Sequence, residues 1–308
     1  MTSLVAGRVG GDRLAGPLAL TFLLRRYARS GASDADDNDE NAQLGDTLGA
    51  ALAFALGGHR DATTTEQRAE WLILFADASV VSGDDRLQAA ARELVHGLRR
   101  SWPDLRYVDE AAMSLVACLH AADIVEPLPD PLVPAVIDEL ERIVGAAYRP
   151  GLGMSHTIER SGLPLSDGAW PGDQIHTASA LLSAYDKCGR LPYAMLADEL
   201  MQLVRKQIQG RRLADAAPSD FPGDVPSEVL ILDCAAVQVL CRLAAHYEDS
   251  GYLHDAVTLT DVNYRCEASH LLQSHSAQVL RECQGPHDAL ELERVAAYGL
   301  ALLALTPV

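Results

Sequence analysis

The side chains best suited to chemistry gather between residues 148 and 176. This stretch combines carboxylates, histidines, arginines and a tryptophan, namely Tyr148, Arg149, His156, Glu159, Arg160, Asp167, Trp170, Asp173 and His176. Two carboxyl groups that flank a glycosidic bond can hydrolyse it, and two bases on opposite faces of a carbon can epimerise it. The stretch therefore predicts a sugar site. The alternative is a solvated surface loop in which Asp167 caps the next helix.

Residue type divides the candidate site into two roles. The candidate catalytic residues, which can give or take a proton, are Asp167, Asp173, His176 and Glu159. The candidate substrate-binding residues, which can stack on a sugar ring or bind its polar groups, are Trp170, His156, Arg160, Glu228 and Asp233. On the helix that follows, His176, Ser179 and Ser183 share one strip. That strip faces either a central cavity or solvent.

A second group of acids follows in a proline-rich link near residues 210–228. Asp220, Asp224 and Glu228 lie there, and one of them is a candidate second carboxylate. Asp233 sits in the apolar run 229–236, where an unpaired charge would be costly to bury. We expect it to cap a helix that begins at Cys234, or else to point into a wet cavity.

The acidic segment between residues 30 and 41 invites two metal-dependent interpretations. Its residues do not fit a calcium-binding EF-hand loop. Asp34, Asp36 and Asp37 match the DxDD pattern of some terpene cyclases. The cavity of such an enzyme needs aromatic walls to stabilise a carbocation, and only 5% of the residues here are aromatic. A solvated loop is the preferred interpretation, and a terpene-type cyclase using Asp36 and Asp37 is a remote alternative. Neither metal ligand spacing nor a cofactor motif is found, so no metal and no cofactor are predicted.

Helical periodicity of three and four runs through nearly the whole chain. The expected helices span 17–29, 41–57, 66–81, 84–100, 109–124, 131–147, 170–187, 191–209, 228–248, 252–269 and 288–305. Glycines 83, 189 and 251 mark tight joints within helical hairpins. Long links separate the hairpins, at 58–65, 101–108, 148–169, 210–227 and 270–287. This alternation predicts an all-α fold, an α/α toroid of about six hairpins that is possibly incomplete. An open solenoid of the same hairpins is the alternative.

Composition limits the partners and the compartment. The 308 residues carry a net charge of −18, which argues against nucleic acid or an anionic membrane surface as a partner. We expect one domain over 1–308, without a signal peptide or a membrane span. The six cysteines form no CxxC pair, so we expect reduced thiols packed as small hydrophobes in a cytoplasmic protein.

The stretch from 131 to about 305 resembles the helical region of the thioredoxin-domain proteins related to the spermatogenesis-associated, bacterial YyaL-type family. The matching motifs are Gly151-Leu152-Gly153-Met154-Ser155-His156, Asp167-Gly168-Ala169-Trp170, Ala180-Leu181-Leu182-Ser183-Ala184-Tyr185, Pro226-Ser227 and Ala235-Ala236-Val237-Gln238-Val239-Leu240. The segment 70–102 is similar to an earlier hairpin of the same region. This resemblance implies a six-hairpin toroid, as in N-acylglucosamine 2-epimerases and many glycoside hydrolases and lyases.

The sequence departs from that family in one respect. We find neither the thioredoxin-like module expected before the helical region nor a CxxC motif, so no redox role is carried over. We expect instead a carbohydrate-binding or carbohydrate-processing toroid, similar to a glycoside hydrolase or sugar epimerase, with its site on the face that carries links 148–173 and 210–228. The alternative is a non-catalytic helical scaffold that binds a protein partner.

Overall fold

Helices make up nearly all of the chain that the computed structural model describes, which is residues 16–30, 38–125, 131–158, 170–215, 227–249, 264–282 and 289–306. The α-helices in these ranges are α2 (Pro17–Ser30), α3 (Asn38–Gly58), α4 (Thr65–Ser82), α5 (Asp85–Ser101), α6 (Val108–Val125), α7 (Leu132–Ala147), α8 (Pro171–Cys188), α9 (Leu191–Asp215), α10 (Ser227–Asp249), α12 (Tyr264–Glu282) and α13 (Ala289–Leu305). Short 3-10 turns η2 (His59–Asp61) and η3 (Trp102–Asp104) lie in two of the links. The strands β1 (Tyr148–Arg149) and β2 (Gly153–Met154) form an antiparallel hairpin.

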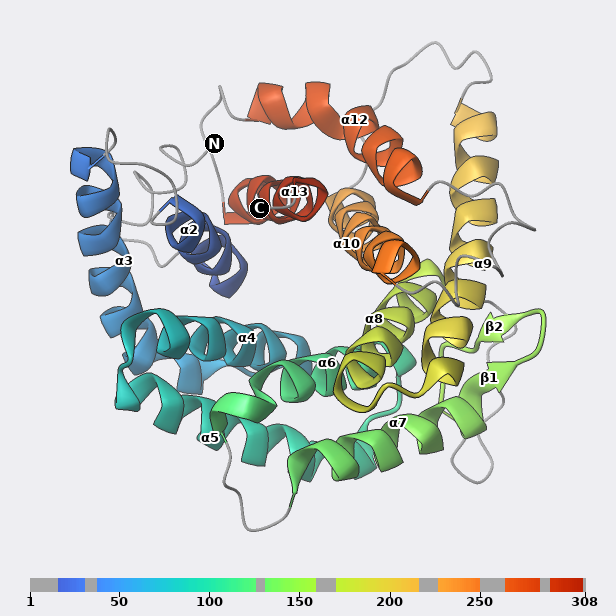
Figure 1. Ribbon diagram of the computed structural model, residues 1–308, viewed down its shortest axis with the longest axis horizontal. Helices are drawn as coiled ribbons and strands as arrows, with labels where there is room; N and C mark the ends of the chain where they lie inside the picture. The colour runs from blue at the N-terminus through green and yellow to red at the C-terminus, as the bar shows by residue number, and fades with distance from the viewer. Residues whose placement is uncertain are drawn as a thin grey trace.

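The helices form two concentric layers around a central axis (Figure 1). Helices α2, α4, α6, α8, α10 and α13 form the inner layer, in which each contacts the next and α13 contacts α2. Helices α3, α5, α7, α9 and α12 lie outside them. The predicted all-α toroid is therefore confirmed. The contact between α13 and α2 closes the ring, so the open solenoid is wrong.

Burial patterns distinguish the outer helices from the inner ones. In α5 the buried residues recur every three or four positions (Leu87, Ala90, Ala91, Leu94, Val95 and Leu98), which gives one apolar face toward the ring. In α6 the buried residues occur around most of the helix, and many of them are alanine. A helix buried on most sides cannot show a clean amphipathic stripe. Small side chains let its neighbours approach closely on both sides.

Left-handed glycines make two of the predicted joints. Gly83 ends α4 with φ +67°, and Gly189 ends α8 with φ +68°. Each donates its backbone N–H to a carbonyl in the last turn of its helix, Ser79 for Gly83 and Tyr185 for Gly189. This geometry disfavours side chains with a Cβ and reverses the chain into the outer helix. The third predicted joint, Gly251, lies outside the described residues.

The predicted boundaries fail in the last third of the chain. A helix over 252–269 with a link over 270–287 was expected, but α12 runs from Tyr264 to Glu282, so the link prediction is wrong. The buried positions of α12 include His275 and Gln278 as well as Leu271, Leu272 and Val279. Because polar residues occupy these core positions, the helical spacing of apolar residues is not apparent in the sequence of α12.

Helix α10 contains a segment, Val229–Tyr247, whose length and apolar composition would allow it to cross a membrane. In the ring this helix packs against α8, α12 and α13. A helix in the core of a protein can be equally long and equally apolar without entering a membrane. The apolar character of α10 is thus accounted for by its inner position.

A close approach of α13 to α2 closes the ring. A Cβ built on Gly299 would lie 2.4 Å from Cε2 of the Phe22 ring, and Phe22 is buried against the core. At the end of the seam, Arg29 donates a hydrogen bond to the carbonyl of Thr306 at 3.0 Å. Glycine at position 299 is therefore required by the space between the two helices.

We predict that Gly299→Ala destabilises the chain by about 1–3 kcal/mol, because the buried Phe22 ring must move. Urea unfolding measures this loss. Gly97→Ala is the matched control, because a Cβ at this position in α5 meets nothing within 4 Å. It should gain about 0.5–1 kcal/mol from helix propensity. Equal effects of the two substitutions would contradict the closed seam.

Candidate active site

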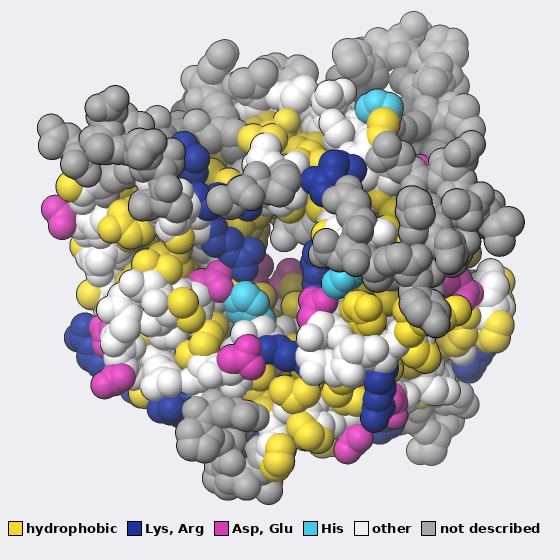
Figure 2. All heavy atoms as spheres, viewed as in Figure 1, with side chains coloured by type: hydrophobic (Ala, Val, Ile, Leu, Met, Phe, Trp, Pro, Cys, Tyr) yellow, Lys and Arg dark blue, Asp and Glu magenta, His cyan; other side chains and the backbone are white. Residues whose placement is uncertain are grey.

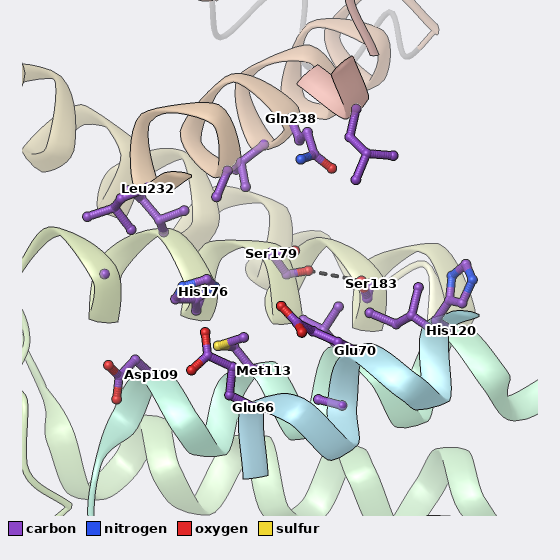
Figure 3. A pocket seen from close by; sticks show the side chains of 18 of the residues that line it. Glu66, Glu70, Asp109, Met113, His120, His176, Ser179, Ser183, Leu232 and Gln238 are labelled. Atoms are coloured by element: carbon purple, nitrogen blue, oxygen red, sulfur yellow. Dashed lines mark hydrogen bonds between the residues drawn. The ribbon is translucent and has the colours of Figure 1, made fainter. Parts of the chain in front are cut away.

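The inner helices enclose a cavity of about 1090 Å³. All six inner helices line it, from the first turns of α4, α6 and α8 to the last turns of α6 and α8. Figure 2 shows the hollow at the centre of the ring, with charged side chains of both signs and histidines around it. Figure 3 shows Glu66, Asp109 and His176 toward one end of the cavity and His120 toward the other.

One end of the cavity is acidic because three inner helices begin there. Glu66, Asp109 and Asp173 lie in the first turns of α4, α6 and α8. The amide end of a helix carries partial positive charge and stabilises a nearby carboxylate. We call the region lined by Glu66, Asp109 and Asp173 the acidic end.

The link between α7 and α8 forms a strap, residues 153–158, across this end. The Gln174 side chain holds it, donating from Nε2 to the Met154 carbonyl (2.8 Å) and accepting from the Met154 N–H at Oε1 (2.7 Å). Gly153 has φ +87°, and a Cβ there would lie 2.4 Å from Gln174 Oε1. The strap also pairs with the chain before α6, where the Val108 N–H donates to the His156 carbonyl at 3.0 Å. Links 101–108 and 148–158 thus lie together.

The strap places His156 between two aromatic rings. The ring centroid of His156 lies 4.7 Å from that of Tyr107 and 5.2 Å from that of Trp170, and both pairs are stacked. Trp170 is 60% exposed, whereas Trp71 and Trp102 are buried. Of the three tryptophans, only Trp170 lines the cavity.

Asp173 is the polar centre of the acidic end. Its carboxylate is completely buried. Oδ1 accepts a hydrogen bond from the Asp109 N–H at 3.2 Å, and His156 Nδ1 lies 3.1 and 3.2 Å from the two oxygens. One ligand atom from each of Asp109, His156 and Asp173 lies within 4.8 Å of the others. These three groups can share a proton, and they are also near enough to hold a divalent cation.

The pKa of Asp173 is raised to about 7, and burial is the largest cause. The negative charge of Asp109 contributes to this rise, while the hydrogen bond and the charge of His156 oppose it. Below about pH 7 this carboxyl therefore holds a proton, as a general acid at neutral pH must. Burial lowers the pKa of His176, which favours the neutral form of its ring.

The opposite wall carries two further acids on α4. The pKa of Glu70 is raised to about 8, mainly by burial and in addition by the charges of Glu66 and Glu293. Burial also raises the pKa of Glu66, with added contributions from Asp109 and Glu110. Figure 3 shows Glu70 between the two ends of the cavity. At neutral pH its protonated carboxyl can donate a hydrogen bond to a ligand.

The far end of the cavity balances its charges. Asp77 contacts Arg25 (2.8 Å) and His120 (2.5 Å). Lys187 pairs with Asp123 at 2.6 Å, and Arg242 with Asp186 at 2.8 Å. Among the described residues that line the cavity, Arg25, Lys187 and Arg242 are the only Lys or Arg side chains. These three cations therefore neutralise acids at the far end, and none of the three pairs with an acid of the acidic end.

The structure brings together four of the predicted site residues, and the roles assigned to them stay predictions. Trp170, His156, Asp173 and His176 all line the cavity. Ser179 and Ser183 line it as well, so the polar strip of α8 faces the cavity and not bulk solvent. Among the remaining candidates, Glu159, Arg160 and Asp167 lie outside the described residues, as do Asp220, Asp224 and the acidic residues Asp34, Asp36 and Asp37; Glu228 lies in α10, and its side chain is not described.

The expectation for Asp233 is wrong. Helix α10 begins at Ser227, so Asp233 lies inside the helix and does not cap it. Its side chain is buried between α10 and α12, where Oδ2 contacts His275 Nε2 at 3.0 Å. Asp233 is not among the residues that line the cavity. Pairing with a histidine from a helix distant in sequence explains how this carboxylate tolerates an apolar run.

Sequence reasoning missed Glu66, Glu70, Asp109 and Tyr107. A signal for two of them was present, since Glu66 and Asp109 lie in the first turns of expected helices, as Asp173 does. When alternate helices of a toroid each carry an acid in the first turn, these acids meet at one end of the ring. Tyr107 and Glu70 gave no comparable signal, because only the folded ring brings Tyr107 against His156 and Glu70 to the cavity.

No protein-family model matches the sequence, and no curated protein matches it either. Solved structures do match. An unsaturated glucuronyl hydrolase specific for heparin superposes with a TM-score of 0.62 at 13% identity, covering 96% of this chain and 94% of that one. The GH76A α-1,6-mannanase of Salegentibacter sp. HEL1_6, as an inactive variant in complex with α-1,6-mannotetrose, gives a TM-score of 0.60 at 11% identity, covering 94% and 88%.

A glycoside hydrolase family 76 mannosidase from Bacteroides thetaiotaomicron VPI-5482 gives a TM-score of 0.54 at 8% identity, covering 98% of this chain and 87% of that one. These similarities establish the six-hairpin glycosidase-like fold. These structures give no support to a relationship with thioredoxin-domain proteins. They do support the toroid that this resemblance implied.

We predict that two substitutions move the pKa of Asp173 in opposite directions. His156→Gln removes an interaction that lowers this pKa, so the pKa should rise. Asp109→Asn removes a charge that raises it, so the pKa should fall. Carboxyl-detected NMR titration measures both. Asp123→Asn, at the far end of α6, should leave the value unchanged, and shifts in one common direction would contradict the described arrangement.

We predict that Glu70→Gln stabilises the chain at high pH. The folded-state pKa of about 8 lies above the ordinary 4.5, so ionisation in the folded state costs stability as the pH rises through this window. The gain over the original chain should be small at pH 5 and at most about 5 kcal/mol at pH 9. Chemical unfolding at both values checks it. Glu93→Gln, which removes an exposed partner of Arg60, should change stability by less than about 1 kcal/mol at either pH.

Proposed function

We propose that this chain is a glycoside hydrolase whose proton donor is Asp173. The observation that carries the proposal is the buried carboxyl group of Asp173, with a pKa of about 7, beside Asp109 in a large cavity. Two carboxyl groups with different protonation states are what hydrolysis of a glycosidic bond requires. The aromatic face of Trp170 at the same end suits a sugar ring.

The proposed reaction follows from these positions. Asp173 gives its proton to the glycosidic oxygen as the bond from the sugar to that oxygen breaks. Asp109 stabilises the positive charge that develops on the sugar or bonds to it directly, and water supplies the hydroxyl group that completes the product. One carboxylate oxygen of Asp109 and one of Asp173 lie within 4.8 Å of each other. This limit is nearer to the separation of about 5–5.5 Å in retaining enzymes than to the about 6.5–9.5 Å that leaves room for an inverting water. The spacing therefore favours retention of configuration.

The structural neighbours support this class of reaction. One is a hydrolase specific for heparin and another is an α-1,6-mannanase in complex with mannotetrose. The mannanase is described as inactive when two consecutive aspartates are replaced. Consecutive acids also begin α6 here, as Asp109 and Glu110. These parallels support glycoside chemistry and leave the identity of the sugar open.

The remote alternative, a terpene-type cyclase, is disfavoured by the cavity wall. Trp170 is the only Phe, Tyr or Trp among the described residues that line it. A carbocation intermediate would find few aromatic faces there. The scaffold alternative predicts that no glycoside is bound or cleaved.

We predict that leaving-group chemistry separates the roles of the two aspartates. Asp173→Asn should lower hydrolysis of glycosides with poor leaving groups by about 10²–10⁴-fold. It should affect dinitrophenyl glycosides far less, because that leaving group departs without a proton. Asp109→Asn should impair both kinds of substrate. Kinetics on a panel of glucosides, mannosides, galactosides and glucuronides measures these effects.

Glu93→Gln, on the outer helix α5 and not among the residues that line the cavity, serves as the control and should keep its activity. Loss of activity on adding a chelator would instead assign the cluster of Asp109, His156 and Asp173 to a metal ion. If no glycoside in the panel is cleaved and none raises the melting temperature, the proposal fails and the scaffold alternative gains support.

A further inference from the structure

Part of the cavity wall consists of apolar side chains that keep part of their surface exposed. We call six of them the apolar belt, namely Leu18, Ile73, Met113, Val116, Leu232 and Ala235. Leu232 lies at the acidic end, since a Cβ on Gly172 would lie 3.8 Å from it, and the polar residues Glu70 and Gln238 line the cavity as well. All six residues of the belt are only partly buried. They come from α2, α4, α6 and α10, and Figure 3 shows Met113 and Leu232 on opposite sides of the cavity.

This exposure is a property of the cavity and does not reflect loose packing of the helices. Leu72 on α4 and Leu115 on α6, each next to a residue of the belt in sequence, are completely buried. The ring is therefore well packed where helices touch, while the belt faces open space. Apolar surface in contact with water is unfavourable, and a concave apolar lining with polar groups at its ends is typical of a ligand site.

The belt begins directly beside the proposed reacting groups. Along α6, Asp109 is followed one turn later by Met113 and then by Val116. On this helix the belt therefore begins about 6 Å from Asp109, and Val116 lies about 10 Å from Asp109 along the helix axis. A substrate held at Asp173 and longer than one sugar ring must occupy it. The polar groups of this region are partly engaged already, since Ser183 bonds to the Ser179 carbonyl and receives a hydrogen bond from Arg242.

From this arrangement, and resting on the proposed function, we infer that the substrate is a glycoside with an apolar aglycone. Its sugar lies at the acidic end, against Trp170, and its aglycone lies in the apolar belt. Hydrolysis then releases the aglycone as an apolar alcohol, whose oxygen receives the proton from Asp173. If the substrate were an oligosaccharide, its further sugars would place hydroxyl groups against the apolar side chains of the belt.

A series of alkyl glycosides with one sugar and increasing chain length tests the inference. Titration calorimetry with Asp173→Asn, which keeps the substrates intact, measures affinity for methyl, butyl and octyl glycosides below their micellar concentrations. We expect affinity to rise by up to about fourfold per methylene group, so that octyl exceeds methyl by well over tenfold. Octanol without a sugar is measured alongside.

Matched substitutions locate the effect. Val116→Thr replaces a methyl group of the belt by a hydroxyl group of similar size and should reduce the ratio of octyl to methyl affinity several-fold. Val133→Thr makes the same change in the outer helix α7, at a partly buried position away from the cavity, and should leave the ratio unchanged.

The outcomes separate this inference from the proposed function. Equal affinities for methyl and octyl glycosides overturn the apolar aglycone and leave glycoside hydrolysis standing. Octanol binding as tightly as the octyl glycoside, with no binding of the methyl glycoside, supports an apolar ligand in the belt but contradicts a sugar site. Equal loss of the ratio in both valine variants also overturns the assignment to the belt.

Discussion

The buried carboxyl group of Asp173 is the constraint around which the site is built. It joins three segments that are distant in sequence, since it accepts the backbone N–H at the start of α6, contacts His156 on the strap and itself belongs to α8. An isolated ionised carboxyl group in this position would be costly to bury. The neighbouring donors reduce that cost, and the remaining burial keeps the proton on Asp173 near neutral pH.

The ring makes this arrangement possible by aligning helix ends. Because α4, α6 and α8 all start at one end, their first turns carry Glu66, Asp109 and Asp173 into one space. The far end has its own acids, but there each faces a cation. The cavity is therefore polarised along its axis. An acidic end, an apolar belt beside it and a neutralised far end would favour one orientation of an elongated, amphipathic ligand.

Much of this fold could be predicted from the sequence, because helical periodicity and glycine joints are local. The tight reversals at Gly83 and Gly189 were predicted and are confirmed. Helix α12 was misplaced because His275 fills a core position as the partner of Asp233. The site was predictable only in part. Asp173, His156 and Trp170 lie near one another in the sequence, whereas Asp109 and Glu70 reach the cavity only through closure of the ring.

The most direct test of the account is a crystal structure of the Asp173→Asn chain with a bound alkyl glycoside. The account predicts that the glycosidic oxygen lies within hydrogen-bond distance of the side chain at position 173, with the sugar ring against Trp170 and the alkyl chain between Met113 and Leu232. A glycoside bound outside the ring, or one whose sugar lies at the far end beside Arg242, would contradict it.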